Sequence, residues 1–287
     1  MIGWRLTRPP RKPLDQRPED FGLERYETVE FPSRDGHTML RGWYISAAEN
    51  GFPSRHYVLI MAHGYSQNRL EPHLPALSLA ARLIADGYDV LMFDFRNAGL
   101  SDGKQTTVGF REQEDLLGAI AYMASRTSAE IGLIGFSMGA ATSLLAAARD
   151  SRVKAVVADS PFYALREYLA ENMPHWTGLP HFPFTPLILT LIPMMLRADL
   201  QAVTPYRAME QLTGTPVLLI HGTGDETIPC TNSEQLLRHA RHPLSRLWLV
   251  PDAGHVRSYA AAPDDYVQTV TGFLEQTAEN PLSLQKG

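Results

Sequence analysis

Two short stretches of this chain place a serine between two glycines in the pattern G-x-S-x-G. Residues 99–103 centre on Ser101, and residues 135–139 centre on Ser137. Flanking glycines let a strand and a helix meet closely around an exposed serine hydroxyl, which becomes a nucleophile when a base beside it takes its proton. The surrounding sequence indicates which of the two serines is placed in this way.

The context favours Ser137. Residues 131–136 are an apolar run of strand length, and residues 138–148 are rich in Ala and Leu, as expected of a helix. Ser137 therefore falls where a strand gives way to a helix. The N–H of Met138 then lies at the helix N-terminus, where a negatively charged oxygen is favoured. Ser101 is instead followed by polar and β-branched residues, which predict a glycine-rich turn.

An acid and a base for Ser137 are expected after later strands, because the carboxyl ends of parallel strands meet at one edge of a sheet. The apolar residues 217–220 precede Asp225, and the apolar residues 247–250 precede His255. In such a set the carboxylate orients the histidine, and the histidine takes the serine proton. Ser137, Asp225 and His255 are therefore the candidate nucleophile, acid and base, in that chain order.

The pattern of elements predicts a sheet that can bring these residues together. Strands are expected at residues 26–31, 39–44, 57–62, 89–93, 131–136, 153–158, 217–220 and 246–250. Helices are expected at residues 74–85, 112–125, 138–148, 233–240 and 264–276. Strands that alternate with helices predict an α/β fold with a mostly parallel, eight-stranded sheet and helices on both faces. The alternation stops over residues 160–204, which we interpret as a cap inserted between the core segments 25–159 and 205–280.

From about Tyr26 to Leu274, the chain resembles the α/β-hydrolases, and within them the bacterial serine esterases of the Bem46-like, ABHD13/ABHD17-type group. The segments that carry the resemblance are residues 63–65, 94–103, 135–139, 159–162, 221–225 and 254–255. The resemblance implies that the backbone N–H of Tyr65 joins that of Met138 in an oxyanion hole. Asn97 departs from the group, in which glycine is more frequent at this position, and this departure makes the neighbouring turn harder to predict.

Several other residues compete for the roles of acid and base. Glu226, Asp252 and Asp159 are alternatives to Asp225 as the acid. Asp252 is too near His255 in sequence to be held on a separate strand loop, and the position of Asp159 carries the acid in some hydrolases. Among ten histidines, His255 alone follows the last strand with a glycine before it. For the histidines that end strands, at positions 63 and 221, we expect a bracing role.

The cap is expected to shape the substrate site. It concentrates aromatic, Leu, Ile and Met side chains that cannot all face water without cost. The candidate substrate-binding residues are Phe162, Trp176, Phe184 and Met194. In an alternative interpretation, the same side chains form only the core of the cap.

These residues predict a serine hydrolase of the carboxylesterase type. Its substrates would be small short- to medium-chain acyl or aryl esters, because an apolar and adaptable lining disfavours a charged substrate. A peptidase or amidase and an acyl-protein thioesterase would use the same triad. A hydrolase-like ligand receptor without activity is the alternative from another class of protein.

Composition narrows the choice of partners. The net charge of −5 gives no reason to expect nucleic acid binding, and no pattern specifies an oligomeric state. The single cysteine, Cys230, excludes an intrachain disulfide. Together with the lack of an apolar leader in the first residues, it favours a cytoplasmic location. Without an H-E-x-x-H motif, a cysteine cluster or a P-loop, we expect neither a metal nor a cofactor.

The N-terminal arm, residues 1–24, is basic and rich in proline. This composition is compatible with a weak membrane-surface contact, but it favours a solvated arm that wraps the domain. No transmembrane segment is expected, because the longest uncharged run, residues 182–196, is too short to span a bilayer and contains prolines.

Overall fold

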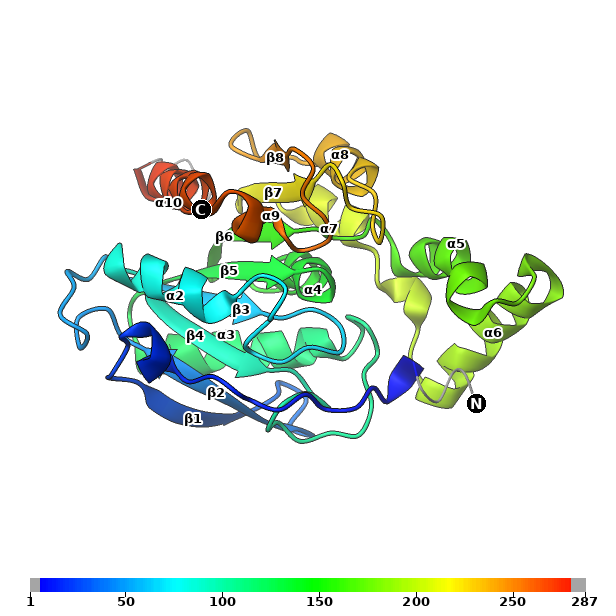
Figure 1. Cartoon of the computed structure of the whole chain (residues 1–287), viewed down its shortest axis with the longest axis horizontal. Coiled ribbons are helices and arrows are strands. Elements are labelled where there is room, and N and C mark those ends of the chain that lie inside the picture. The colour runs from blue at the N-terminus through cyan, green and yellow to red at the C-terminus, as the bar shows by residue number, and fades with distance from the viewer. Residues whose placement is uncertain (1–5, 280–287) are drawn as a thin grey trace.

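The apolar runs of the chain form one eight-stranded sheet with the order β1-β2-β4-β3-β5-β6-β7-β8 (Figure 1). The computed structural model describes residues 6–279. Strand β2 is antiparallel to both of its neighbours, and the strands from β4 to β8 pair in parallel. The strands are β1 (Glu27–Pro32), β2 (Met39–Ile45), β3 (Tyr57–Ala62), β4 (Asp89–Asp94), β5 (Glu130–Phe136), β6 (Val153–Asp159), β7 (Val217–Gly222) and β8 (Arg246–Val250). The predicted mostly parallel sheet is confirmed.

Helices cover both faces of the sheet, because its central strands are apolar on both sides. Successive residues of β3 face opposite layers: Val58 and Ile60 belong to one hydrophobic cluster, Leu59 and Met61 to the other. The first cluster includes residues of α3, α4, α7 and α8, and the second includes residues of α2, α9 and α10. The helices are α2 (Ala76–Ala85), α3 (Glu112–Arg126), α4 (Met138–Ala147), α5 (Leu165–Thr177), α6 (His181–Leu196), α7 (Pro205–Gln211), α8 (Thr231–Arg238), α9 (Ser258–Ala261) and α10 (Pro263–Glu279), with 3₁₀ turns η1 (Pro18–Phe21) and η2 (Leu200–Ala202).

The turn from β5 into α4 depends on two glycines that admit no side chain. A Cβ added at Gly139 would lie 2.0 Å from the carbonyl oxygen of Ala62 at the end of β3. A Cβ added at Gly135 would lie 2.3 Å from the carbonyl oxygen of Gly139. Real side chains do not approach backbone atoms so closely, so only glycine allows helix α4 to begin beside both strands.

The other G-x-S-x-G stretch is a buried turn. Ser101 is fully buried; its hydroxyl donates to the carbonyl oxygen of Asp94 at 2.6 Å and accepts from the N–H of Arg41 at 2.8 Å. These bonds tie the loop after β4 to strand β2. In the same loop Asn97 has a φ of 60°, a left-handed conformation that asparagine adopts more readily than most residues. The turn therefore forms without a glycine at this position.

The segment between β6 and α7 contains α5, α6 and η2, and Figure 1 shows α5 and α6 set apart from the layers of the sheet. Helix α6 has exposed large apolar side chains at Phe182, Leu187, Leu191 and Met194. Within residues 6–279, no helix combines the length and the apolar character needed to cross a membrane.

The close approach at Gly139 leads to a first prediction. Gly139→Ala should lower the free energy of unfolding by at least about 3 kcal/mol, because the new methyl group overlaps the backbone of β3. Urea denaturation measures the change. Gly272→Ala is the matched control: a Cβ at this position in α10 meets nothing within 4 Å, so it should raise stability by up to about 1 kcal/mol. Equal stability of the two variants would contradict the role given to Gly139.

Candidate active site

Ser137 occupies the junction between β5 and α4 in a conformation that few residues adopt. Its φ and ψ are 53° and −115°, and its N–H donates to the carbonyl oxygen of Asp159 at 2.8 Å. Such backbone strain persists where the surrounding structure imposes it, and it is frequent at functional sites. Helix α4 begins at Met138, so the first free N–H groups of the helix lie beside the Ser137 hydroxyl.

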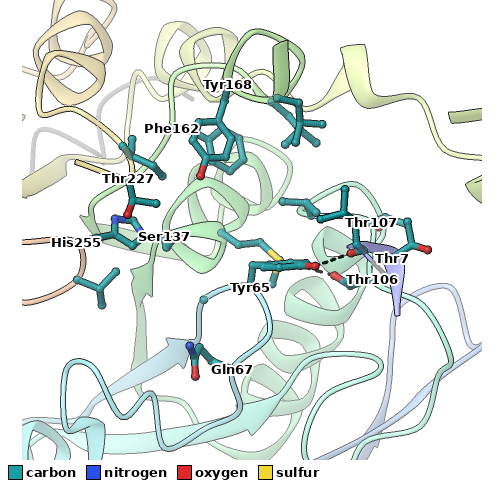
Figure 2. A pocket seen from close by; sticks show the side chains of 18 of the residues that line it. Thr7, Tyr65, Gln67, Thr106, Thr107, Ser137, Phe162, Tyr168, Thr227 and His255 are labelled. Atoms are coloured by element: carbon teal, nitrogen blue, oxygen red, sulfur yellow. Dashed lines mark hydrogen bonds between the residues drawn. The ribbon is translucent and has the colours of Figure 1, made fainter. Parts of the chain in front are cut away.

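The structure brings the three candidate residues into one hydrogen-bonded chain. The hydroxyl of Ser137 donates to Nε2 of His255 at 2.9 Å, and Nδ1 of His255 donates to Oδ2 of Asp225 at 2.7 Å. The His255 side chain is 23% exposed, whereas the Asp225 side chain is fully buried. Figure 2 shows Ser137 and His255 pointing toward one another at one side of the pocket. This geometry allows a proton to pass from Ser137 to His255.

Backbone bonds between two loops set the distance from Asp225 to His255. The N–H of Thr223 donates to the carbonyl oxygen of Val250 at 2.9 Å, and that of Gly224 donates to Ala253 at 3.0 Å. These bonds continue the pairing of β7 with β8 beyond the strand ends. The loop after β7 and the loop after β8 therefore hold the acid and the base as one unit.

The surroundings of Asp225 stabilise its charged form. Burial alone would raise its pKa, but hydrogen bonds from His221 and His255 and from the N–H of Ile228 hold the pKa well below its usual range. Nε2 of His221 lies 3.2 Å from Oδ2 of Asp225 and 2.8 Å from the carbonyl oxygen of Ile228. Asp225 thus remains a carboxylate that can orient His255 and stabilise its protonated form.

The competing acids lie elsewhere. Glu226 and Asp252 are exposed, and neither is hydrogen-bonded to a histidine among the described residues. Asp159 is fully buried at the end of β6, where it accepts a hydrogen bond from Ser160 at 2.9 Å. Burial raises the pKa of Asp159 to about 6. Asp159 therefore holds the turn at Ser160 and, through its carbonyl oxygen, the N–H of Ser137. The hydrogen bond to His255 is made by Asp225.

The loop after β3 lies against Ser137 and the start of helix α4. A Cβ added at Gly64 would be 3.5 Å from the Cβ of Ser137, and both Gly64 and Tyr65 line the same pocket as Ser137 and Met138. Nδ1 of His63 donates to the carbonyl oxygen of Gly64 at 2.8 Å, and its Nε2 accepts from the N–H of Phe95 at 3.0 Å. His63 therefore braces the ends of β3 and β4.

Glu71 is a site residue that sequence reasoning missed. Its Oε2 accepts a hydrogen bond from the N–H of Gly64 at 2.6 Å, which fixes the His63–Gly64 peptide, one peptide before the N–H of Tyr65. Burial raises its pKa to about 7, against the opposing effects of the Gly64 bond and of Lys12. Glu71 also lines the pocket. No periodic pattern marks this residue, and only its proximity to residues 63–65 in sequence could have suggested it.

A largely apolar cavity of about 430 Å³ opens beside Ser137 and His255. Phe162, which is 1% exposed, lines it and stacks on Tyr168 of α5 with ring centroids 5.6 Å apart. The other side chains that line it from residues 160–204 are Leu165, Leu169, Met173, Leu196 and Leu200. Within this segment, most of the lining residues belong to α5, and Leu196 lies at the end of α6.

Two candidates for substrate binding do not line this cavity. Phe184 is 38% exposed and Met194 is 70% exposed, both on α6. Helix α6 is apolar around its circumference, so its sequence does not reveal which side faces the cavity. The side chain of Trp176 lies outside the described part of the structure, and its role stays a prediction.

Within residues 6–279, no group of three or more His, Cys, Asp or Glu side chains is arranged to hold a metal ion. The polar side chains that line the cavity include Ser137, His255, Glu71 and His73.

Comparisons with known proteins agree with this architecture. The alpha/beta hydrolase fold family matches residues 57–201. The uncharacterized protein YqkD of Bacillus subtilis is 29% identical over 272 residues, covering 91% of this chain and 85% of YqkD. The structure of the Pyrococcus furiosus esterase PF2001 superposes with a TM-score of 0.77 and 28% identity, covering 94% of this chain and 98% of that one. Est1E of Butyrivibrio proteoclasticus with ferulic acid bound, at 20% identity and a TM-score of 0.69, shares the fold and covers 88% of this chain and 100% of its own.

The raised pKa of Glu71 leads to a prediction about pH. A buried carboxyl group whose pKa rises on folding stabilises the protein at low pH, and this stabilisation is lost as the pH rises from about 4.5 to about 7. The Glu71→Gln variant lacks the titrating group and can still accept from Gly64. Its free energy of unfolding relative to wild type should therefore increase between pH 5 and pH 8, by on the order of 3 kcal/mol.

Urea denaturation at the two pH values measures this difference. Glu226→Gln, at an exposed carboxylate, is the control and should change by the same small amount at both pH values. If the free energy of unfolding changed equally with pH in Glu71→Gln and in wild type, Glu71 would not be held in a desolvated site.

Proposed function

This chain belongs to the alpha/beta hydrolase fold family, and from this premise we propose that it is a serine esterase that cleaves small carboxylic esters through an acyl-enzyme intermediate. The observation that carries the proposal is the Ser137–His255–Asp225 hydrogen-bonded chain beside an apolar cavity. The likeness to the Pyrococcus furiosus esterase supports the same class of reaction.

In the first half of the reaction, Ser137 is acylated. His255 Nε2 takes the hydroxyl proton as Oγ forms a bond to the ester carbonyl carbon. The carbonyl oxygen becomes an oxyanion, which the N–H groups of Met138 and Tyr65 stabilise. The C–O bond to the alcohol then breaks, and His255 gives its proton to the departing oxygen.

In the second half, water replaces the alcohol. His255 takes a proton from the water as its oxygen attacks the acyl carbon, and the oxyanion forms again in the same place. The bond to Oγ breaks, His255 returns its proton to Ser137, and the carboxylic acid leaves. Asp225 holds the histidine ring in its orientation through both halves and stabilises its positive charge.

The cavity supports acyl or aryl esters as substrates. It is lined mainly by carbon atoms, and its volume of about 430 Å³ suits a short- to medium-length acyl chain. We further propose that residues 160–204 act as a cap over this cavity, because Phe162, α5, the end of α6 and η2 supply one part of its apolar lining. Apolar contact of this kind separates neighbouring chain lengths only modestly.

The test compares the two serines of the G-x-S-x-G stretches. Ser137→Ala should reduce kcat/KM for p-nitrophenyl butyrate by on the order of 10³-fold or more and should abolish labelling by a fluorophosphonate, which forms a bond to Oγ with loss of fluoride. Ser101→Ala is the control: it should lose about 1 to 3 kcal/mol of stability, because Ser101 is buried and hydrogen-bonded, but should still be labelled.

The opposite result, with labelling lost in Ser101→Ala and retained in Ser137→Ala, would contradict the proposal. A panel of matched butyryl esters, anilides and thioesters then separates the esterase from an amidase, peptidase or thioesterase with the same triad. Absence of turnover on the whole panel, with Ser137 unlabelled, would favour a hydrolase-like receptor.

A further inference from the structure

One side of the cavity is supplied by the N-terminal arm. Leu6 and Thr7 line the same cavity as Ser137, and Thr7 is 6% exposed. The N–H of Thr106 donates to the carbonyl oxygen of Thr7 at 2.9 Å. Figure 2 shows Thr7 near Tyr65 and Thr106, across the pocket from His255. The arm therefore reaches the interior of the site from a distant part of the sequence.

The arm is bound to the loop that carries the proposed oxyanion donor. The hydroxyl of Tyr65 donates to the carbonyl oxygen of Leu6 at 2.6 Å, so the residue whose N–H faces the substrate also holds Leu6. Nζ of Lys12 donates to Oε1 of Gln67 at 2.6 Å, and Nδ2 of Asn68 donates to the carbonyl oxygen of Lys12 at 3.2 Å. These bonds lie along residues 65–68 and fix the course of the arm past the pocket.

A second anchor binds the arm to the loop after β4. The guanidinium of Arg11 donates to three carbonyl oxygens at 3.1, 2.6 and 2.9 Å, those of Gly99, Ser101 and Gly103. The loop that accepts these bonds is itself fastened by the buried hydroxyl of Ser101. Figure 1 shows the arm, in dark blue, running from η1 toward the end of α6.

We propose that Leu6 and Thr7, held in place by the bonds of Arg11 and Lys12, form a fixed wall of the acyl pocket and that Leu6 is a specificity-determining residue for the acyl chain. The inference deepens the proposed function and rests on it. Leu6 is half-buried and packs against the first hydrophobic cluster, which includes residues of α3 and α4. It lines the cavity together with Leu196 and Leu200 of the cap. Core, cap and arm thus enclose an acyl chain from three sides, and the substrate class is an ester whose acyl group is long enough to reach Leu6.

The experiment measures kcat/KM for p-nitrophenyl esters from acetate to decanoate. Leu6→Ala should shift the optimum toward longer chains, because each methylene that gains burial contributes up to about fourfold. Arg11→Ala, which releases the anchor, should shift the profile in the same direction. A purely structural role of Leu6 would change all chain lengths by one common factor, so the ratio of decanoate to butyrate is the decisive readout.

Leu14→Ala is the matched control. Leu14 lies on the same arm but packs against the second hydrophobic cluster, outside the cavity lining. The ratio of kcat/KM for decanoate to kcat/KM for butyrate in Leu14→Ala should equal that of wild type. A wild-type ratio in Leu6→Ala, or an equal shift in Leu14→Ala, would overturn the inference.

Labelling by fluorophosphonates separates this inference from the proposed function. The rate at which alkyl fluorophosphonates of increasing chain length label Ser137 depends on the pocket, whether or not esters are the substrates. Suppose that the wild-type protein hydrolyses no ester, that long-chain fluorophosphonates label Ser137 faster than short-chain ones, and that Leu6→Ala alters this dependence on chain length. The proposed function would then be wrong, and the role of Leu6 in the pocket wall would be supported. If esters are hydrolysed and Leu6→Ala changes neither the ester profile nor the labelling profile, only the role of Leu6 in the pocket wall would be wrong.

Discussion

The approach of helix α4 to the end of strand β3 is the constraint on which the site depends. Gly139 lies so close to the carbonyl oxygen of Ala62 that a Cβ would be 2.0 Å from it. This contact holds Ser137 at a φ of 53°, beside the first N–H of the helix, with its hydroxyl hydrogen-bonded to His255. The loop after β3 then lies against the serine, so the proposed oxyanion donors and the nucleophile share one packed junction.

Much of this arrangement was predictable because it follows local patterns. Alternating strands and helices implied the parallel sheet, and the shared edge of its strands implied that Ser137, Asp225 and His255 would meet. Their roles remain proposals, although the structure joins them by bonds of 2.9 and 2.7 Å. The patterns were less informative where burial depends on distant contacts. Helix α6 is apolar on every side, so its sequence suggested Phe184 and Met194 as lining residues, whereas the structure exposes both.

Two residues that sequence reasoning missed act on the loop after β3. The side chain of Glu71 accepts a hydrogen bond from the N–H of Gly64, and the carbonyl oxygen of Leu6 accepts one from the hydroxyl of Tyr65. Neither residue belongs to a periodic pattern, and Leu6 is 59 positions from Tyr65 in sequence. Such contacts are set by the tertiary course of the chain. They hold the His63–Gly64 peptide and the Tyr65 side chain in place before a substrate arrives, as the proposed stabilisation of an oxyanion by the Tyr65 N–H requires.

The proposed reaction requires that a carbonyl substrate becomes covalently bound to Ser137. Rapid-quench mixing with p-nitrophenyl acetate, followed by peptide mass spectrometry, tests it most directly. We predict a burst of about one p-nitrophenolate per chain and an added acetyl group on the peptide that contains Ser137, lost again as turnover proceeds. An acetyl group that forms and turns over on a different side chain, with Ser137 unmodified throughout, would contradict the account.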